Sequence, residues 1–270
     1  MALLTHMKQF IVFVGILVFY SSIVSAKTEL TLSPSLIYFD YAEFNTIDKQ
    51  LNNETGWLPG VSASVGYSVD SSWSLGIFTA YYDGTVDYDG QTQTGSPHET
   101  DTGTRFIRVG LRIGRVLTPE LGVFILGQSH EWQRNIYDNN NVSGVSETYE
   151  WMEYAAGIAY YKNLNSRNTI TTEASLILVR NADIYVDLSR IDYGTTDLDI
   201  GDGTGGRLNI EWNRQHDESS RYGVGLFLEG WDFGRSNTRP TSGGSSSLIV
   251  TEPRSETRNI GLKFNIKYMF

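Results

Sequence analysis

Apolar and polar residues alternate along most of the chain, and the alternation is clearest at its carboxyl end. One face of this last segment carries only apolar residues: Ile260, Leu262, Phe264, Ile266, Tyr268 and Phe270. The opposite face carries polar residues and glycine: Asn259, Gly261, Lys263, Asn265 and Lys267. Successive side chains of a β-strand point to opposite faces, so this period of two predicts a strand with one apolar and one polar face.

The same period recurs earlier in the chain and gives ten predicted strands in total. They cover residues 30–44, 57–69, 72–83, 104–117, 120–135, 147–162, 168–182, 206–214, 221–233 and 259–270. In the segment 120–135 the two faces are not cleanly separated, so its facing stays open, and a β-bulge is one explanation.

The connections between the predicted strands alternate in length. Residues 70–72, 118–119, 163–167 and 215–220 are short connections, whereas residues 45–56, 84–103, 136–146, 183–205 and 234–255 are long and polar. Short periplasmic turns and long outer loops are typical of transmembrane β-barrels. We therefore predict an all-β fold, a transmembrane antiparallel up-and-down β-barrel of about ten strands, with both termini on the side of the short turns.

Residues 1–26 have the three parts of a secretory signal peptide. Lys8 supplies a positive charge, residues 10–20 form an apolar run, and small residues precede an expected cleavage between Ala26 and Lys27. A membrane-spanning helix needs about 20 apolar residues, so this run is too short for an anchor. The expected mature chain, residues 27–270, forms a single barrel domain, for which we predict export to a bacterial outer membrane.

The bulk composition alone would not indicate a membrane protein. The chain has 270 residues, a formal net charge of −10, no cysteine and a mean hydropathy of −0.26. Lipid-facing and lumen-facing residues of a barrel cancel in such an average. The acidic balance, without a block of basic residues, argues against nucleic-acid binding, because phosphate recognition needs clustered Lys and Arg.

The end of the chain resembles the carboxyl-terminal signature of bacterial outer-membrane proteins. The resemblance rests on a final Phe270 preceded at alternate positions by Tyr268, Ile266 and Phe264. It implies that the barrel-assembly machinery reads this segment during biogenesis and that outer-membrane lipid surrounds the folded barrel. At about ten strands, the predicted barrel is similar in size to the omptin surface proteases.

Charged residues fall on the faces of the predicted strands that would point into the barrel. They are Arg108, Arg112, Glu153, Glu173, Arg207, Glu211, Glu229, Lys263 and Lys267. Barrels of about eight strands are filled by side chains, and an isolated buried charge is very costly. We therefore expect a polar, filled lumen with paired charges, and a narrow channel for small solutes is the alternative.

Candidate catalytic residues do not form a complete set in the sequence. An omptin-like hydrolase would use two acids at the outer rim facing an Asp–His pair, and Asp83, Asp87 and Asp89 are the weak candidates for those acids. His216 and Asp217 fall in a predicted short turn on the opposite side, so the interpretation of the aspartates as loop-solvating residues is favoured. We assign no catalytic, cofactor-binding or metal site, and calcium on the acidic loops is an unfavoured alternative.

The six tryptophans are interpreted as two aromatic girdles at the membrane interfaces. Trp73 and Trp212 fall near the short turns, and the other four fall toward the outer ends of their strands: Trp57, Trp132, Trp151 and Trp231. The leading functional hypothesis is a non-enzymatic surface or structural protein with long hydrophilic outer loops and an unidentified external ligand. The alternatives are an omptin-like surface hydrolase using the rim aspartates and a narrow solute channel.

Overall fold

The computed structural model describes residues 28–92, 95–139 and 142–270. The predicted signal peptide, with its cleavage between Ala26 and Lys27, lies outside the described residues. Ten long strands form the barrel: β1 (Thr28–Phe44), β2 (Gln50–Ser68), β3 (Trp73–Gln91), β4 (Pro97–Thr118), β5 (Leu121–Ile136), β6 (Ser146–Asn163), β7 (Asn168–Asp187), β9 (Gly203–Gln215), β10 (Ser220–Phe233) and β14 (Arg254–Met269).

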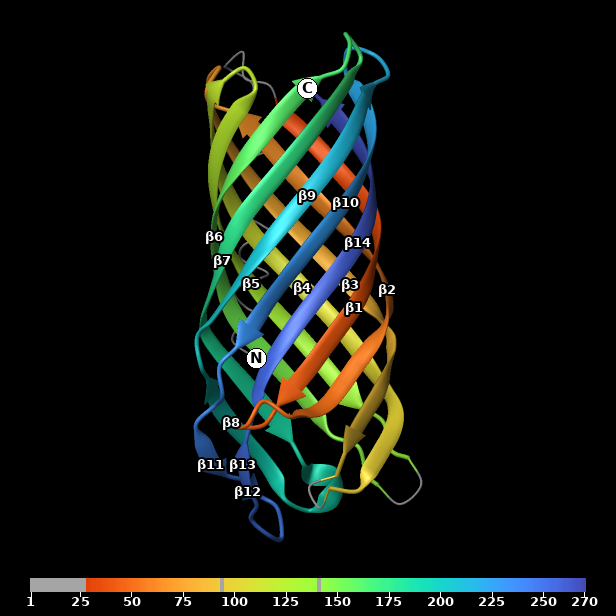
Figure 1. Cartoon of the computed structure of the whole chain (residues 1–270), viewed down its shortest axis with the longest axis vertical. Helices are drawn as coiled ribbons and strands as arrows, with labels where there is room; N and C mark the ends of the chain where they lie inside the picture. Colours follow the sequence, from red (N-terminus) through yellow and green to blue (C-terminus); the bar gives the residue numbers. More distant parts are fainter. Residues whose placement is uncertain (1–27, 93–94, 140–141) are drawn as a thin grey trace.

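Every barrel strand pairs antiparallel with two others, so the sheet has no free edge along its main body (Figure 1). β1 pairs with both β2 and β14, and β7 closes the ring by pairing with β9 over Asn168–Val179. The further part of β7 pairs instead with β8 (Gly194–Ile200), which lies beyond the ring. This arrangement confirms the predicted antiparallel ten-stranded barrel.

The connections between strands are short at one end of the barrel and long at the other. At one end, here called the short-turn end, strands are joined by tight turns, and the carboxyl terminus lies there (Figure 1). At the other, the long-hairpin end, small elements extend the wall: the 3₁₀ turn Ser189–Ile191, β11 (Thr238–Pro240), β12 (Ser242–Gly243) and β13 (Ile249–Thr251). In outer-membrane barrels the short turns face the periplasm.

The long connections expected from the sequence are largely β-structure, which corrects that part of the prediction. β2 begins at Gln50, β3 runs to Gln91 and β4 begins at Pro97, so the predicted loop 84–103 is mostly a hairpin. Its inward side chains, such as Val86 and Tyr88, are buried, while the outward face meets water. A strand whose outer face is solvated needs no apolar residues there, and its polar sequence was therefore misread as a loop.

An apolar belt surrounds the half of the barrel nearer the short turns. Its exposed side chains include Leu30, Leu32, Leu36, Val61, Leu75, Leu111, Ile125, Ile158, Leu176, Leu226, Ile260 and Leu262. Toward the long-hairpin end the belt stops at Tyr38 and Trp57, whose rings lie 5.2 Å apart. Charged residues such as Asp40 and Arg258, which are register partners, follow on the same outer faces. The belt fits the outer surface of a barrel in lipid.

Two local features settle the facing of the central strands. β5 pairs with β6 in continuous register, so the facing left open for 120–135 is not explained by a bulge in this pairing, and Gln128, His130 and Trp132 face inward. A register shift lies instead between β6 and β7, where Asn181 has a φ of 51°. The extra residue moves the even-numbered apolar residues of the following segment, including Ile184, to the inside.

Within the described residues, no helix has the length and apolar character needed to cross a bilayer.

Candidate functional site

Three of the tryptophans expected in an outer girdle lie inside the barrel. Trp132, Trp151 and Trp231 are only 1%, 2% and 4% exposed, which corrects their assignment to the membrane interface. Each lies on the inward face of its strand. On β5, for example, Trp132 is two residues from His130, which is also buried. Trp57 and Trp73, in contrast, are exposed on the outer wall, as predicted.

Aromatic side chains from neighbouring and from non-neighbouring strands meet inside the lumen. The ring of Phe39 on β1 lies 5.4 Å from Phe106 on β4, Phe106 lies 5.3 Å from Trp132 on β5, and Trp132 lies 4.6 Å from Tyr149 on β6. Since β1 neighbours only β2 and β14 in the barrel, the first contact spans the interior. We call this layer the aromatic plug, and it comprises Phe39, Tyr41, Phe106, Trp132, Tyr149, Trp151, Trp231 and Phe233.

The aromatic plug is completed by aliphatic residues and lies at the outer limit of the apolar belt. Ile37, Leu58 and Ile184 are fully buried in the same cluster. Phe39 lies between Tyr38, the last belt residue of β1, and Asp40, the first charged residue beyond it. The lumen is therefore filled by closely packed side chains at the level where the barrel leaves the belt.

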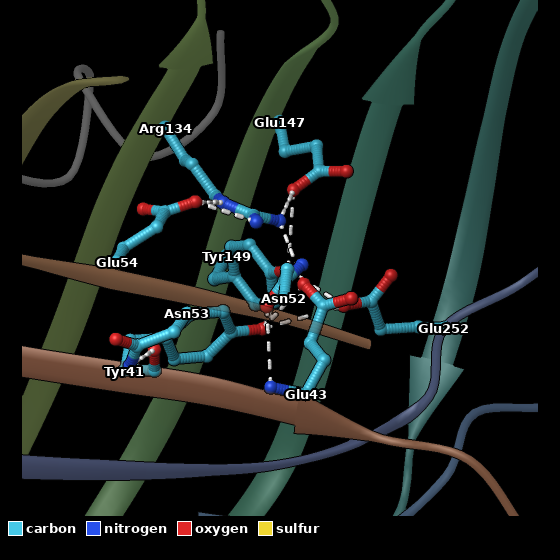
Figure 2. A network of polar contacts seen from close by, with 9 residues as sticks. All are labelled: Tyr41, Glu43, Asn52, Asn53, Glu54, Arg134, Glu147, Tyr149 and Glu252. Carbon is cyan, nitrogen blue, oxygen red and sulfur yellow. Dashed lines mark hydrogen bonds and ion pairs between the residues drawn. The ribbon is translucent and has the colours of Figure 1, made fainter. Parts of the chain in front are cut away.

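A buried ionic cluster lies beyond the plug, on the side of the long hairpins (Figure 2). The guanidinium of Arg134 donates to Glu54 at 2.6 Å from Nε and to Glu147 at 2.6 Å from Nη1. The same Nη1 lies 2.9 Å from Oε1 of Glu43. These groups come from β1, β2, β5 and β6, so Arg134 ties four strands together across the interior. We call these residues, with Glu252, the Arg134 cluster.

Glu252 brings the long hairpin between β10 and β14 into this cluster. The hydroxyl of Tyr149 donates to Glu252 at 2.8 Å, and the Tyr41 hydroxyl lies 3.5 Å from the same carboxylate oxygen (Figure 2). The backbone N–H of Glu252 in turn donates to Oγ of Ser236 at 2.7 Å. Residues 234–253, here called the cap hairpin, thus place one buried carboxylate in the mouth of the barrel, and they also pair with β8 through β12.

The Arg134 cluster has more carboxylates than cations, and it lies beyond the belt. Burial raises the pKa of Glu54 to about 7, although Arg134 opposes the shift. Burial also raises the pKa of Glu147 and raises that of Glu252 well above its usual range, with Glu43 adding to the shift of Glu252. A carboxyl with a raised pKa is held in its protonated form over a wider pH range, so proton uptake relieves part of the repulsion in this cluster.

This excess of carboxylates predicts a barrel mouth that loses stability as the pH rises. A carboxyl whose pKa is raised on folding stabilises the folded state fully at a pH below its unfolded pKa, which is 4.5 for Glu54. This stabilisation is lost as the pH rises through the folded pKa of about 7, and for Glu54 alone it amounts to roughly 3 kcal/mol. Hydrogen exchange of the β2 residues around Glu54 should therefore be faster at pH 8 than at pH 5, beyond the intrinsic pH effect on exchange. Glu54→Gln should flatten this dependence, and an equal dependence in both proteins would contradict the prediction.

A second ionic network lies on the other side of the aromatic plug, within the belt. Arg108 reaches across the lumen to Glu229 with two contacts, of 2.6 and 3.0 Å. Arg207 bridges Glu229 at 2.9 Å and Glu153 at 3.1 Å. His130 lies 3.1 Å from Glu153 and is stacked on Trp151, with 4.4 Å between their rings.

All the lumen charges named from the sequence point inward and take part in ion pairs. Besides the network of Arg108, Glu153, Arg207 and Glu229, Arg112 contacts Glu173 at 2.6 Å. Glu211 is shared by two lysines, Lys263 at 3.1 Å and Lys267. The opposite charges come from different strands, as burial in a filled barrel requires.

The remaining part of the lumen is a polar cavity of about 1190 Å³, here called the vestibule. It extends from the network of Arg108 and Glu229 to the short-turn end, where Asn165, Arg167 and Gln215 line it. The lumen is polar here, as predicted, but side chains fill it mainly at the plug and not along its whole length. A solute at the short-turn end meets this vestibule and then the plug.

The rim candidates do not converge with a histidine in the described part of the chain. Asp83 lies on the outer wall and pairs with Arg105 at 3.3 Å, and both side chains are nearly half exposed. Asp87 and Asp89 are exposed on the same outward face of β3, whereas the nearby His98 is buried. Over residues 28–92, 95–139 and 142–270, no group of three or more His, Asp or Glu residues is arranged to hold a metal ion.

Comparison with known proteins places the fold. No family model matches the chain, and no curated protein matches it. Among solved structures, the chain is similar to the outer membrane protease OmpT from Escherichia coli, with a TM-score of 0.63 at 8% identity over 91% of this chain and 96% of that one.

A looser likeness connects the chain to further barrels. The outer membrane protein OprG from Pseudomonas aeruginosa gives a TM-score of 0.42 at 11% identity, over 90% of this chain and 97% of that one. The Pseudomonas putida toluene transporter TodX gives 0.34 at 8% identity, over 90% of this chain and 89% of that one. At such identities the likeness shows the fold alone. The protein is thus an outer-membrane-type β-barrel, closed by ten antiparallel strands.

Proposed function

We propose that this protein is a non-enzymatic barrel of a Gram-negative outer membrane, exported by its cleaved signal peptide and closed to the passage of solutes. Its long hairpins extend on the outer side, and its vestibule opens toward the periplasm. In this role the barrel is a structural element that displays β-hairpins at the cell surface while keeping the permeability barrier intact.

The aromatic plug is the observation that carries the proposal. Phe39, Trp132 and Tyr149 are at most 1% exposed, and Phe39 on β1 meets Trp132 on β5 from a strand that is not its neighbour. A packed protein interior leaves few voids larger than a water molecule. The ion pairs of Arg108 and Arg134 lie on the two sides of the plug, so any path for a solute would have to separate buried charges as well as rings.

The outward direction of the rim aspartates supports the non-enzymatic part of the proposal. A general acid or base must reach its substrate within hydrogen-bond distance, usually in a cleft that gathers several groups. Asp83 is instead paired with Arg105 on the outer wall. The fold shared with OmpT carries no protease activity to this chain, because function is determined by sites and not by folds.

Swelling of liposomes tests the proposed closure. Vesicles containing the refolded protein are diluted into an isotonic solution of a small neutral sugar, with empty vesicles and vesicles carrying a wide porin as controls. We expect the same slow response as in empty vesicles. Sugar uptake that scales with the amount of folded protein would overturn the proposal.

A further inference from the structure

One wall of the vestibule concentrates positive charge. Lys263, Asn265 and Lys267 follow one another on the inward face of β14, and Arg221 on β10 is the direct register partner of Lys267. Like charges directly opposite each other on neighbouring strands are destabilising. Glu211 on β9 is the carboxylate that both lysines contact. We call Arg221, Lys263, Asn265 and Lys267 the basic wall.

The charge of the whole vestibule has the same sign. Its lining contains seven cationic side chains: Arg108, Arg112, Arg167, Arg207, Arg221, Lys263 and Lys267. Its anionic side chains number four: Glu29, Glu173, Glu211 and Glu229. Even when Glu153, which pairs with Arg207, is added, the cations exceed the carboxylates by two. This excess lies inside a protein whose formal net charge is −10.

Gly225 on β10 makes room for Lys263 of the basic wall. A Cβ at Gly225 would lie 2.7 Å from Cε of Lys263, so a side chain at this position would displace the end of the lysine. The neighbouring strand is thus shaped around the lysine and leaves the cavity open in front of it.

A buried donor without a partner lies between the two lysines. Asn265 is 1% exposed, its Oδ1 accepts from Ser33 at 2.6 Å, and its Nδ2 has no hydrogen-bond partner among the described residues. Burying an amide donor without a partner is unfavourable, so an acceptor supplied by a ligand or by water is favoured at this place. Two ammonium groups, a guanidinium and an amide N–H together provide donors suited to an oxyanion.

We infer that the basic wall of the vestibule is a binding site for a small anion bearing phosphate groups, which enters from the short-turn end. Charge-assisted hydrogen bonds from Lys263, Lys267 and Arg221 hold the anion, and Glu211 competes with it for the two lysines. The site does not depend on the closure of the plug, because the vestibule opens on the opposite side.

Titration of the purified, full-length mature barrel with inorganic phosphate and pyrophosphate tests this site. Calorimetry in a zwitterionic detergent at low salt measures the affinity, and heat-dependent gel migration confirms that each variant is folded. Lys267→Gln should weaken binding about tenfold or more, because it removes one charge-assisted hydrogen bond to the anion. Glu211→Gln should strengthen it, because it releases both lysines from their carboxylate.

A matched control separates the site from a general charge effect. Arg115→Gln removes one positive charge from the outer face of β4 near the same end, and it should leave the affinity unchanged. Binding that weakens equally in Lys267→Gln and Arg115→Gln, or that weakens in Glu211→Gln, would overturn the inference. A purely structural role of the basic wall would change the stability of these variants without moving their affinities in opposite directions.

A lipid headgroup carries the same phosphate chemistry as a free solute, and one further arm distinguishes them. The titration is repeated with a short-chain phosphatidic acid below its micelle concentration. Binding of phosphate or pyrophosphate that depends on Lys267 identifies a soluble ligand, whereas Lys267-dependent binding of the lipid alone identifies a headgroup. Absence of binding by all three probes would refute the site.

Discussion

Replacing Arg134 by glutamine is expected to destabilise the folded barrel by about 3–5 kcal/mol, because it leaves buried carboxylates without their cation. Glu43, Glu54 and Glu147 all lie within 2.9 Å of the guanidinium, and each of their side chains is at most 10% exposed. Glu252 adds a fourth carboxylate to the same group through Tyr149. Equilibrium unfolding by urea in lipid vesicles measures the loss.

Two variants show whether this loss arises from uncompensated charge. Arg105→Gln removes an arginine from a half-exposed ion pair with Asp83 and should cost no more than about 1 kcal/mol. Glu54→Gln combined with Arg134→Gln should be more stable than Arg134→Gln alone, because one buried carboxylate is neutralised. Equal losses for Arg134→Gln and Arg105→Gln would show that the Arg134 cluster does not hold the barrel mouth together.

Truncation of Trp132 to alanine is the second change with a large expected effect. Its ring contacts Phe106, Tyr149 and Tyr41, with 4.9 Å between the centroids of Tyr41 and Trp132. Removing a buried Trp or Phe side chain typically costs about 3–5 kcal/mol, since neighbouring groups cannot close the cavity fully. We expect a loss of this size in the same urea measurement.

The matched control is a tryptophan on the outside of the barrel. Trp57 is 58% exposed and contacts Tyr38 at the limit of the belt, so Trp57→Ala should cost clearly less than Trp132→Ala. A greater loss for Trp57→Ala would mean that contacts at the outer surface, and not the aromatic plug, dominate the stability of this end.

Much of the fold follows from alternation alone. The period of two locates all ten barrel strands and assigns Arg108, Glu229 and Lys263 correctly to the inside, because lipid and lumen demand opposite side chains at successive positions. The same rule fails beyond the belt, where both faces of a strand accept polar residues. The hairpin of β3 and β4, with Asp87 and Asp101 as register partners, was therefore predicted as a loop.

The functional features depend on information that a single strand does not carry. A tryptophan fits both an interfacial girdle and a core, so Trp132 can be placed only once the facing of β5 is known. The Arg134 cluster gathers residues as far apart as Glu43 and Glu252, and its signal in the sequence is only the continuation of inward parity from Trp132 to Arg134. The bulge at Asn181 likewise shifts parity without a glycine or proline to mark it.

The lumen is thus divided into two parts with different properties. On the side of the long hairpins, the aromatic plug and the Arg134 cluster form a packed interior that connects the strands to the cap hairpin. On the side of the short turns, the vestibule keeps a polar volume of about 1190 Å³ within the belt. A ten-stranded wall therefore suffices both to enclose a packed core and to leave a polar chamber toward the short-turn end.

Single-channel recording across a planar lipid bilayer tests the central claim most directly, namely that buried side chains close the lumen between the vestibule and the outer medium. The refolded wild-type protein is inserted and held at voltages of both signs in potassium chloride. The structure predicts a membrane that stays at its baseline current after insertion. A steady, ion-selective conductance that grows stepwise with each inserted molecule would contradict it.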